Sequence, residues 1–120
     1  MNLIDYAFPD YDDTLPKIKG FSDYSYKNDT CPSIGMEVNP SEYIMIYCDY
    51  KNPNRSESYT GGEYYRFFVM LDLTMDEKQI NPKFIGMFKT KNEVKQFIKN
   101  HTIDQLKAME DLSWWIVIKQ

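Results

Sequence analysis

The densest group of side chains that could do chemistry is the segment 23–33, which reads DYSYKNDTCPS. It places Cys31, a strong nucleophile once it is deprotonated, among Ser, Thr, Asp and Asn residues. A cysteine nucleophile needs a base that removes its proton, and His101 is the only histidine of the chain. A triad of Cys31, His101 and Asp29 is one interpretation, because such residues need to be neighbours only in the fold.

The same segment also fits a rigid loop without catalytic function. Its Asn-Asp and Pro-Ser pairs are turn formers, and Asp and Ser side chains bind nearby backbone amides. His101 stands at the end of a predicted helix, where a basic side chain complements the helix dipole. We therefore predict a rigid loop and no catalytic set, with Tyr24 and Tyr26 available to anchor a partner protein.

The chain offers no complete ligand set for a metal or a cofactor. Asp10, Asp12 and Asp13 resemble the start of a calcium loop, but Leu and Phe stand where that loop needs glycine and glutamate. One histidine and two isolated cysteines do not make a zinc site at ordinary spacing. The glycine pair at 61–62 lacks the Lys and Ser or Thr of a phosphate-binding loop. We expect neither a metal nor a cofactor.

Composition and charge limit the possible partners. A chain of 120 residues with 42% hydrophobic and 16% aromatic residues predicts one folded domain. Residues 1–50 hold nine carboxylates against three Lys, a net of -6, whereas residues 51–120 hold nine against eleven bases, a net of +2. Nucleic-acid binding over the whole surface would need a basic field, so we expect no direct binding of nucleic acid. An acidic front half favours a partner with a basic surface.

Three further features predict a cytoplasmic protein with reduced thiols. Residues 1–13 carry no Lys or Arg and no apolar run, unlike a secretory signal. The longest apolar runs are far shorter than the roughly 20 residues that cross a bilayer, so we expect no contact with a membrane. Two cysteines are too few for a disulfide framework, although one bridge between Cys31 and Cys48 is geometrically possible.

Residues 1–39 combine turn formers with interleaved aromatic side chains. This pattern predicts an acidic, loop-rich segment that packs on the rest of the domain and contains one short strand near 18–26. A disordered extension over the first 15 residues is the alternative. The polar connection 52–62 is long enough to be a functional loop.

The remainder of the chain, residues 42–119, predicts a β-β-β-α-α-β core. Alternating apolar positions indicate strands, and the capping signatures Thr90 with Glu93 and Thr102 with Gln105 begin two short helices. We therefore expect an α+β fold: an antiparallel sheet of four or five strands with two short helices on one face. The strands expected in this core are 42–51, 64–73, 83–89 and 113–119.

The block D-x-S-Y-x-N-D-x-C-P-S, with the loop 55–57 and the strand 65–67, resembles small proteins of phages and other mobile elements. Some proteins of that class are anti-CRISPR or other anti-defence inhibitors, which bind and block a host effector. The resemblance implies an inhibitory role and implies no catalytic residues.

These observations favour a small acidic protein that binds and inhibits a host nucleic-acid-targeting defence complex. Its expected partner is a protein or ribonucleoprotein effector with a basic surface. The alternatives are an immunity protein or antitoxin that neutralises a basic toxin, a small enzyme with a Cys31 nucleophile, and a structural phage component. The residues expected to bind the partner are Asp10, Tyr11, Asp12, Asp13, Asp23, Tyr24, Tyr26 and Asp29.

Overall fold

The computed structural model describes residues 2–57, 59, 61–72 and 83–112. Within these residues the fold is α+β, as predicted, with five strands and three short α-helices, of which the sequence predicted two. The predicted strand 113–119 lies outside the described residues. In chain order the elements are α1 (Leu3–Ala7), β1 (Ser22–Asp23), β2 (Ser33–Asn39), β3 (Glu42–Cys48), a 3-10 turn (Pro53–Arg55), β4 (Phe67–Asp72), β5 (Lys83–Phe88), α2 (Lys91–Lys99) and α3 (Ile103–Lys107).

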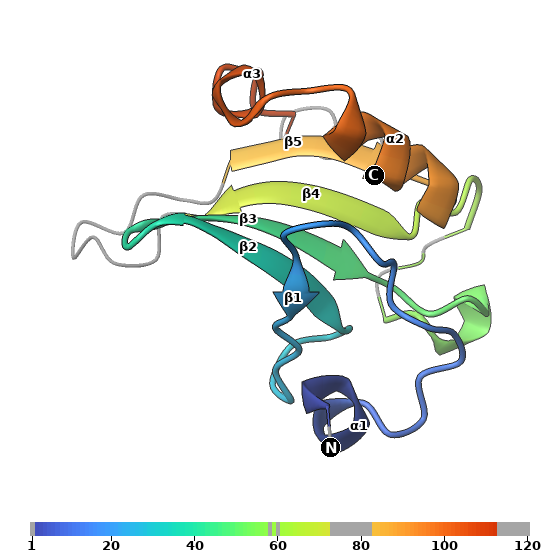
Figure 1. Ribbon diagram of the computed structural model, residues 1–120. Coiled ribbons are helices and arrows are strands. Elements are labelled where there is room, and N and C mark those ends of the chain that lie inside the picture. Colours follow the sequence, from blue (N-terminus) through green and yellow to red (C-terminus); the bar gives the residue numbers. More distant parts are fainter. Residues whose placement is uncertain (1, 58, 60, 73–82, 113–120) are drawn as a thin grey trace.

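The strands form one antiparallel sheet in the order β1-β2-β3-β4-β5, so each strand pairs with its neighbour in sequence (Figure 1). The predicted antiparallel sheet is confirmed, and β3 is a central strand because β2 and β4 flank it. The predicted strand 42–51 ends later than β3 does, and the predicted strand 64–73 begins earlier than β4. Arg66 lies just before β4 and Asp49 just after β3, and both belong to a polar network described below.

One face of the sheet carries the hydrophobic core. Ile44, Ile46 and Cys48 of β3 are fully buried, as their alternation predicts. They stand opposite Leu71, Val69 and Phe67 of β4 in the antiparallel register. Val94 of α2 and Leu106 of α3 join this cluster, so both helices cover the same face of the sheet. The other face carries partly buried side chains such as Tyr43, Tyr47 and Phe68.

Both predicted helix starts are confirmed. The Thr90 hydroxyl accepts the Glu93 amide, and the Thr102 hydroxyl accepts the Gln105 amide, which completes a capping box at each helix. Helix α3 ends at Lys107. Every helix in the described part of the chain is too short and too polar to cross a membrane.

Strand β2 corrects the prediction that residues up to 39 are loop-rich. Ile34, Met36 and Val38 alternate toward the core, but Gly35 and the turn formers around the segment hid this pattern. Gly35 has a packing reason, because a Cβ there would lie 2.3 Å from the Tyr24 ring and 2.6 Å from the Met45 sulfur. The glycine therefore lets Tyr24 lie across the sheet.

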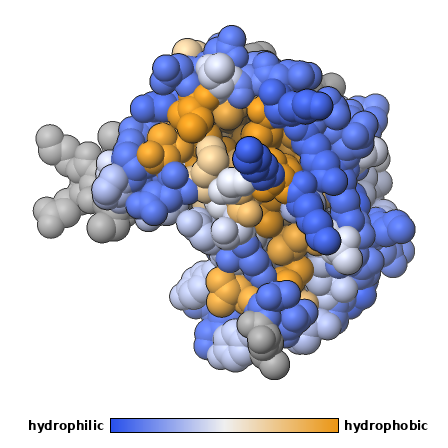
Figure 2. Space-filling model, in the orientation of Figure 1, coloured by the Kyte–Doolittle hydropathy of each residue, from blue (hydrophilic) through white to orange (hydrophobic). Residues whose placement is uncertain are grey.

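Residues 8–21, here called the strap, cross the same face of the sheet that α2 and α3 cover (Figure 1). Tyr11, Leu15, Ile18 and Phe21 of the strap pack against the core cluster. Figure 2 shows this side of the molecule, with apolar side chains in its middle and hydrophilic side chains around them. The aromatic residues of the front segment are thus partly used in packing, as their interleaving predicts.

Candidate functional site

The block 23–33 joins β1 to β2 and is held by local hydrogen bonds. The Ser25 amide donates to the Asp23 carboxylate at 3.0 Å, and the Ser33 amide donates to the Ser25 hydroxyl at 3.2 Å. The Tyr24 amide donates to the Ser33 carbonyl at 3.0 Å. These contacts agree with the predicted rigid loop, in which Asp and Ser side chains organise the backbone.

Cys31 lies at the end of this block, and its thiol is buried. Burial, together with the nearby Asp49 carboxylate, raises the pKa of the Cys31 thiol to about 12. His101 Nδ1–H donates to the Phe97 carbonyl at 2.6 Å, just beyond the end of α2. Helix α2 packs on β5, whereas Cys31 precedes β2, and β3 and β4 lie between those strands. The fold therefore does not bring the two residues of the hypothetical triad together.

Alkylation of Cys31 should be slow at neutral pH. Thiolate is the reactive form, and a thiol that is buried and has a raised pKa supplies little of it. We expect iodoacetamide to modify Cys31 well below the rate of a small free thiol, as measured by mass spectrometry of the native protein. Cys31→Ala should function as the wild type does. Rapid modification together with an inactive Cys31→Ala variant would instead favour the enzyme hypothesis.

The carboxylates of Asp10, Asp12 and Asp13 hold the strap in place. Asp12 accepts the backbone amides of Lys51 and Asn52 at 2.7 and 2.8 Å. Asp10 pairs with Arg55 at 2.8 Å. These residues resemble the opening of a calcium loop in sequence, but in the fold they bind amides and bases that follow β3. The described residues contain no group of three or more His, Cys, Asp or Glu side chains that could hold a metal ion.

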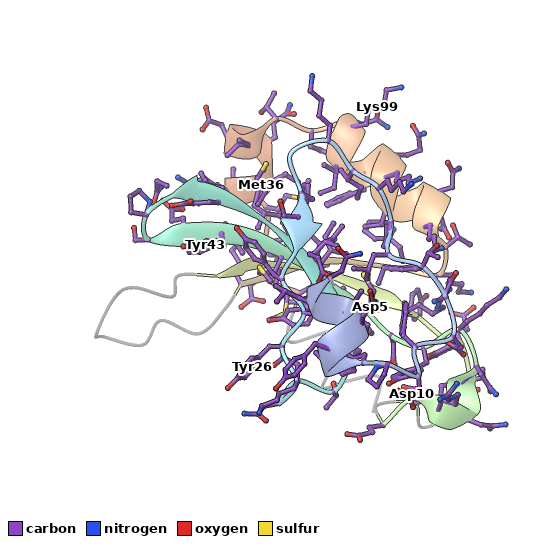
Figure 3. All side chains as sticks on the ribbon, turned by 60° about the horizontal axis from the view of Figure 1, so that its bottom comes forward. Asp5, Asp10, Tyr26, Met36, Tyr43 and Lys99 are labelled. Atoms are coloured by element: carbon purple, nitrogen blue, oxygen red, sulfur yellow. The ribbon has the colours of Figure 1, made fainter. Side chains whose placement is uncertain are left out.

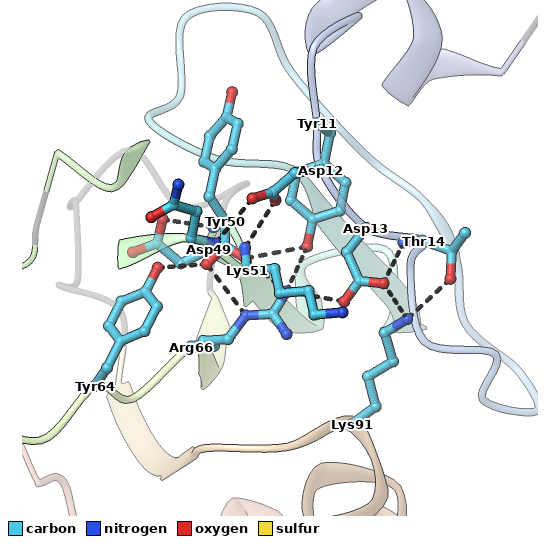
Figure 4. Close-up of polar contacts among 11 residues, drawn as sticks. Tyr11, Asp12, Asp13, Thr14, Asp49, Tyr50, Lys51, Tyr64, Arg66 and Lys91 are labelled. Atoms are coloured by element: carbon cyan, nitrogen blue, oxygen red, sulfur yellow. Dashed lines mark hydrogen bonds and ion pairs between the residues drawn. The ribbon is translucent and has the colours of Figure 1, made fainter. Parts of the chain in front are cut away.

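Arg66 is the centre of a buried polar network that the sequence analysis did not identify (Figure 4). Its guanidinium donates to the Asp49 carbonyl at 3.1 Å, to the Tyr50 carbonyl at 3.2 Å and to the Asp13 carboxylate at 3.1 Å. The Tyr11 hydroxyl also donates to the Asp49 carbonyl at 3.1 Å. Arg66 is only 9% exposed, so this network replaces the water that would otherwise solvate its charge.

Asp13 links the network to helix α2. Its carboxylate accepts Arg66 on one oxygen and the Lys91 ammonium on the other, the latter at 2.8 Å. Partial burial would raise the pKa of Asp13, but the hydrogen bond from Lys91, the Thr14 amide and the hydrogen bond from Arg66 together hold that pKa at about 2. Asp13 therefore stays ionised and clamps the strap to two basic residues from distant parts of the chain.

Stability should fall at acidic pH because of Asp13. The pKa of this group is lower in the folded chain than its ordinary value of 3.8, so its contribution is present above about pH 4 and is lost as the pH falls through about 2. Asp13→Asn should be less stable than the wild type at neutral pH, and the difference should shrink toward pH 2. Urea midpoints from pH 7 to pH 2 measure this. The control is Asp5→Asn, which removes an exposed carboxylate and should keep the wild-type dependence of stability on pH. If the difference in stability between Asp13→Asn and the wild type did not change with pH, the role of Asp13 would be contradicted.

The acidic front half is largely neutralised from within the molecule. Bases from the second half of the chain meet its carboxylates in three places: Asp10 with Arg55, Asp13 with Arg66 and Lys91, and Glu42 with Lys107. Much of the charge asymmetry between the two halves of the sequence therefore serves to pair carboxylates of the first half with bases of the second half inside the fold. Only carboxylates outside these contacts can contribute an acidic surface to a partner.

Three large apolar side chains remain exposed at one end of the molecule. Leu3 is 52% exposed, Tyr6 66% and Tyr26 55%; Leu3 and Tyr6 are three positions apart and so share a face of α1. Figure 3 shows Tyr26 beside α1, the helix that carries Asp5. We call Leu3, Asp5, Tyr6, Tyr26 and Asp29 the α1 face.

Asp23 and Tyr24 position this face and contribute little exposed surface themselves. The Asp23 carboxylate accepts the Ile4 amide at 2.8 Å, which ties α1 to the block 23–33. The Tyr24 ring packs edge-on against Tyr43, with ring centroids 6.1 Å apart. Asp29 sits in a turn in which its amide donates to the Tyr26 carbonyl, and partial burial raises the pKa of its carboxyl group. A cation from a partner would offset the cost of ionising that carboxyl group.

The predicted partner-binding residues thus fall into separate groups. Tyr26 and Asp29 lie on the α1 face, Asp23 and Tyr24 support it, and the remaining four belong to the strap: Asp10, Tyr11, Asp12 and Asp13. Leu3, Asp5 and Tyr6 were not predicted to bind the partner. The sequence signal that could have indicated them is the helical spacing of Leu3 and Tyr6 with the acidic Asp5 between them.

Comparison of the chain with known protein families, curated proteins and solved structures found no match.

Proposed function

We propose that the protein is a small acidic inhibitor that covers a basic surface on a host nucleic-acid-targeting defence complex, with the α1 face as its contact surface. The observation that carries the proposal is the exposure of Leu3, Tyr6 and Tyr26 at one place. Among the described residues, only Ile103 on α3 joins them as an exposed large hydrophobic side chain.

Clustered aromatic side chains are typical of the centre of a protein–protein interface. A few Tyr, Trp or Arg residues supply most of the binding energy there, whereas single exposed apolar residues are ordinary on any surface. Tyr6 and Tyr26 offer large rings that lose few rotamers on binding. Helix α1 and the rigid block 23–33 present these rings on an ordered backbone, which lowers the entropic cost of association.

The carboxylates of the α1 face support a basic partner. Asp5 is exposed and Asp29 partly exposed, and within the described residues neither has a base within ion-pair distance. The strap carboxylates, in contrast, are used internally. Complementary charge at the rim of an interface accelerates association and selects the partner. Nucleic-acid-targeting effectors expose basic surfaces to their targets, which agrees with the inhibitory role that the phage-type resemblance implies.

The direct test is inhibition of purified effectors. The protein is titrated into target-binding assays of RNA-guided host effectors and, in parallel, into activity assays of basic toxins from the same hosts. We expect inhibition of an effector near one protein per complex, with association that slows as salt is raised. Neutralisation of a toxin without any effect on effectors would replace this proposal with an immunity role. Inhibition that persists after the side chains of the α1 face are substituted would show that this face is not the contact surface.

A further inference from the structure

A second surface, independent of the α1 face, lies on the layer formed by α2 and the strap. It carries four lysines, Lys17 and Lys19 on the strap and Lys95 and Lys99 on α2, which we call the lysine face. Ile18 of the strap and Ile98 of α2 pack against the same core cluster, so both elements cover the same face of the sheet. In Figure 1 and Figure 3 the strap runs beside α2, and Lys99 points away from the body of the protein.

Lys91 fixes the strap next to the helix. Its ammonium group donates to the Asp13 carboxylate and to the Thr14 hydroxyl, both at 2.8 Å. The opposite end of the strap passes close to β2 at Gly20, where an added Cβ would lie 3.2 Å from the Met36 sulfur, and Ile18 and Phe21 beside it pack against the core. The backbone between these two points is thus held over the sheet, and the lysines that it carries have a defined place.

The lysines form two short rows of similar spacing. Pro16 is buried and Ile18 packs inward, so Lys17 and Lys19 project outward, at most about 7 Å apart along the backbone. Lys95 and Lys99 are one helical turn apart, about 6 Å along the axis of α2. Such rows present repeated positive charge to a linear anion.

The two segments that carry these lysines are positively charged although the protein carries a net charge of -4. Residues 14–20 hold two Lys and no carboxylate, and residues 91–99 hold three Lys and one Glu. That glutamate, Glu93, accepts the Thr90 amide in the capping box. Within the described residues, none of the four lysines has a carboxylate within ion-pair distance.

We propose that the lysine face binds the phosphodiester backbone of nucleic acid without sequence preference. Lysine is depleted at protein–protein interfaces, whereas Lys contacts with phosphates supply most of non-specific nucleic-acid binding. The aromatic Phe97 of α2 is turned toward the core, so it is not available to stack on a base. The sequence argues against a basic field over the whole surface, but the fold gathers lysines from two distant segments into one patch. Bound nucleic acid would lie over α2 and the strap, away from the α1 face.

The test is fluorescence anisotropy of labelled single-stranded DNA, single-stranded RNA and duplex DNA, with the protein alone. Four phosphate contacts on a single strand predict a slope of log K against log salt of about -3, or a loss of roughly 50-fold in affinity between about 50 and 200 mM salt. Lys17→Ala/Lys19→Ala and Lys95→Ala/Lys99→Ala should each reduce the slope by about half. Lys27→Ala/Lys51→Ala makes the same change in net charge at exposed positions elsewhere and should keep the slope.

Three results would overturn the proposal: no binding at low salt, an equal loss in the Lys27/Lys51 control, or tighter binding of a polyglutamate peptide than of an oligonucleotide. The last result would assign the surface to an acidic protein. Variants of Tyr6 and Tyr26 leave the lysine face intact, so failure of this proposal and failure of the proposed inhibitory contact are separate outcomes.

Discussion

Replacement of Arg66 by Met should destabilise the protein by about 3–5 kcal/mol, as expected when one partner of a buried ion pair is removed. Arg66 is the only base in the described structure that contacts the Asp13 carboxylate, the Tyr11 hydroxyl and the carbonyls after β3 together. Without it, the Asp49 carbonyl loses a donor and Asp13 keeps only Lys91 as its cation. Urea denaturation at neutral pH measures the free energy of unfolding.

The matched control is Arg55→Met, which breaks the exposed pair with Asp10. That pair is solvated on both sides, so its loss should cost less than about 1 kcal/mol. A second measurement follows the strap directly. Cys48 is fully buried in the core that the strap covers, so Arg66→Met should increase its reaction with a thiol reagent more than Arg55→Met does. Equal, small effects of both substitutions would show that the network does not hold the strap.

The sequence was sufficient for the elements whose signals are local. Alternation predicted β3 and β4, and two capping signatures placed the starts of α2 and α3 correctly, because periods and caps depend on residues within a few positions. Strand β2 was missed because Gly35 weakens its strand pattern, and that glycine is explained only by the packing of Tyr24 across it in the fold. Helix α1 was missed because its five residues carry no side-chain cap and depend on Asp23, 19 positions away.

The candidate site was harder to predict for the same reason. A cluster of Asp residues in the strap indicates an acidic surface when read alone, but Asp13 meets Lys91 at 78 positions' distance and Asp12 meets the Lys51 amide at 39. No local pattern records which charges a fold brings together. The prediction of a partner-binding region near Tyr26 and Asp29 remains open to test, and it now includes Leu3, Asp5 and Tyr6 from α1.

The double variant Tyr6→Ala/Tyr26→Ala should weaken binding to the partner far more than it affects the fold. Each ring, if it is a central anchor of the interface, contributes about 2 kcal/mol or more, which corresponds to about 30-fold in affinity for each residue. Both side chains are more than half exposed, so their removal should change the unfolding free energy by about 0.5 kcal/mol or less. Titration of the partner by isothermal calorimetry, together with urea denaturation, separates the two effects.

The control for surface apolarity is Ile103→Ala, because Ile103 is also exposed, at 40%, but lies on α3. It should leave the affinity unchanged. Substitution of Asp5 and Asp29 by Asn should act differently from loss of the rings: charges at the rim mainly set the association rate, so that rate and its salt dependence should fall while dissociation changes little. Full affinity of Tyr6→Ala/Tyr26→Ala for the partner would show that the contact surface does not include α1. A loss of affinity in Ile103→Ala would indicate that it includes α3.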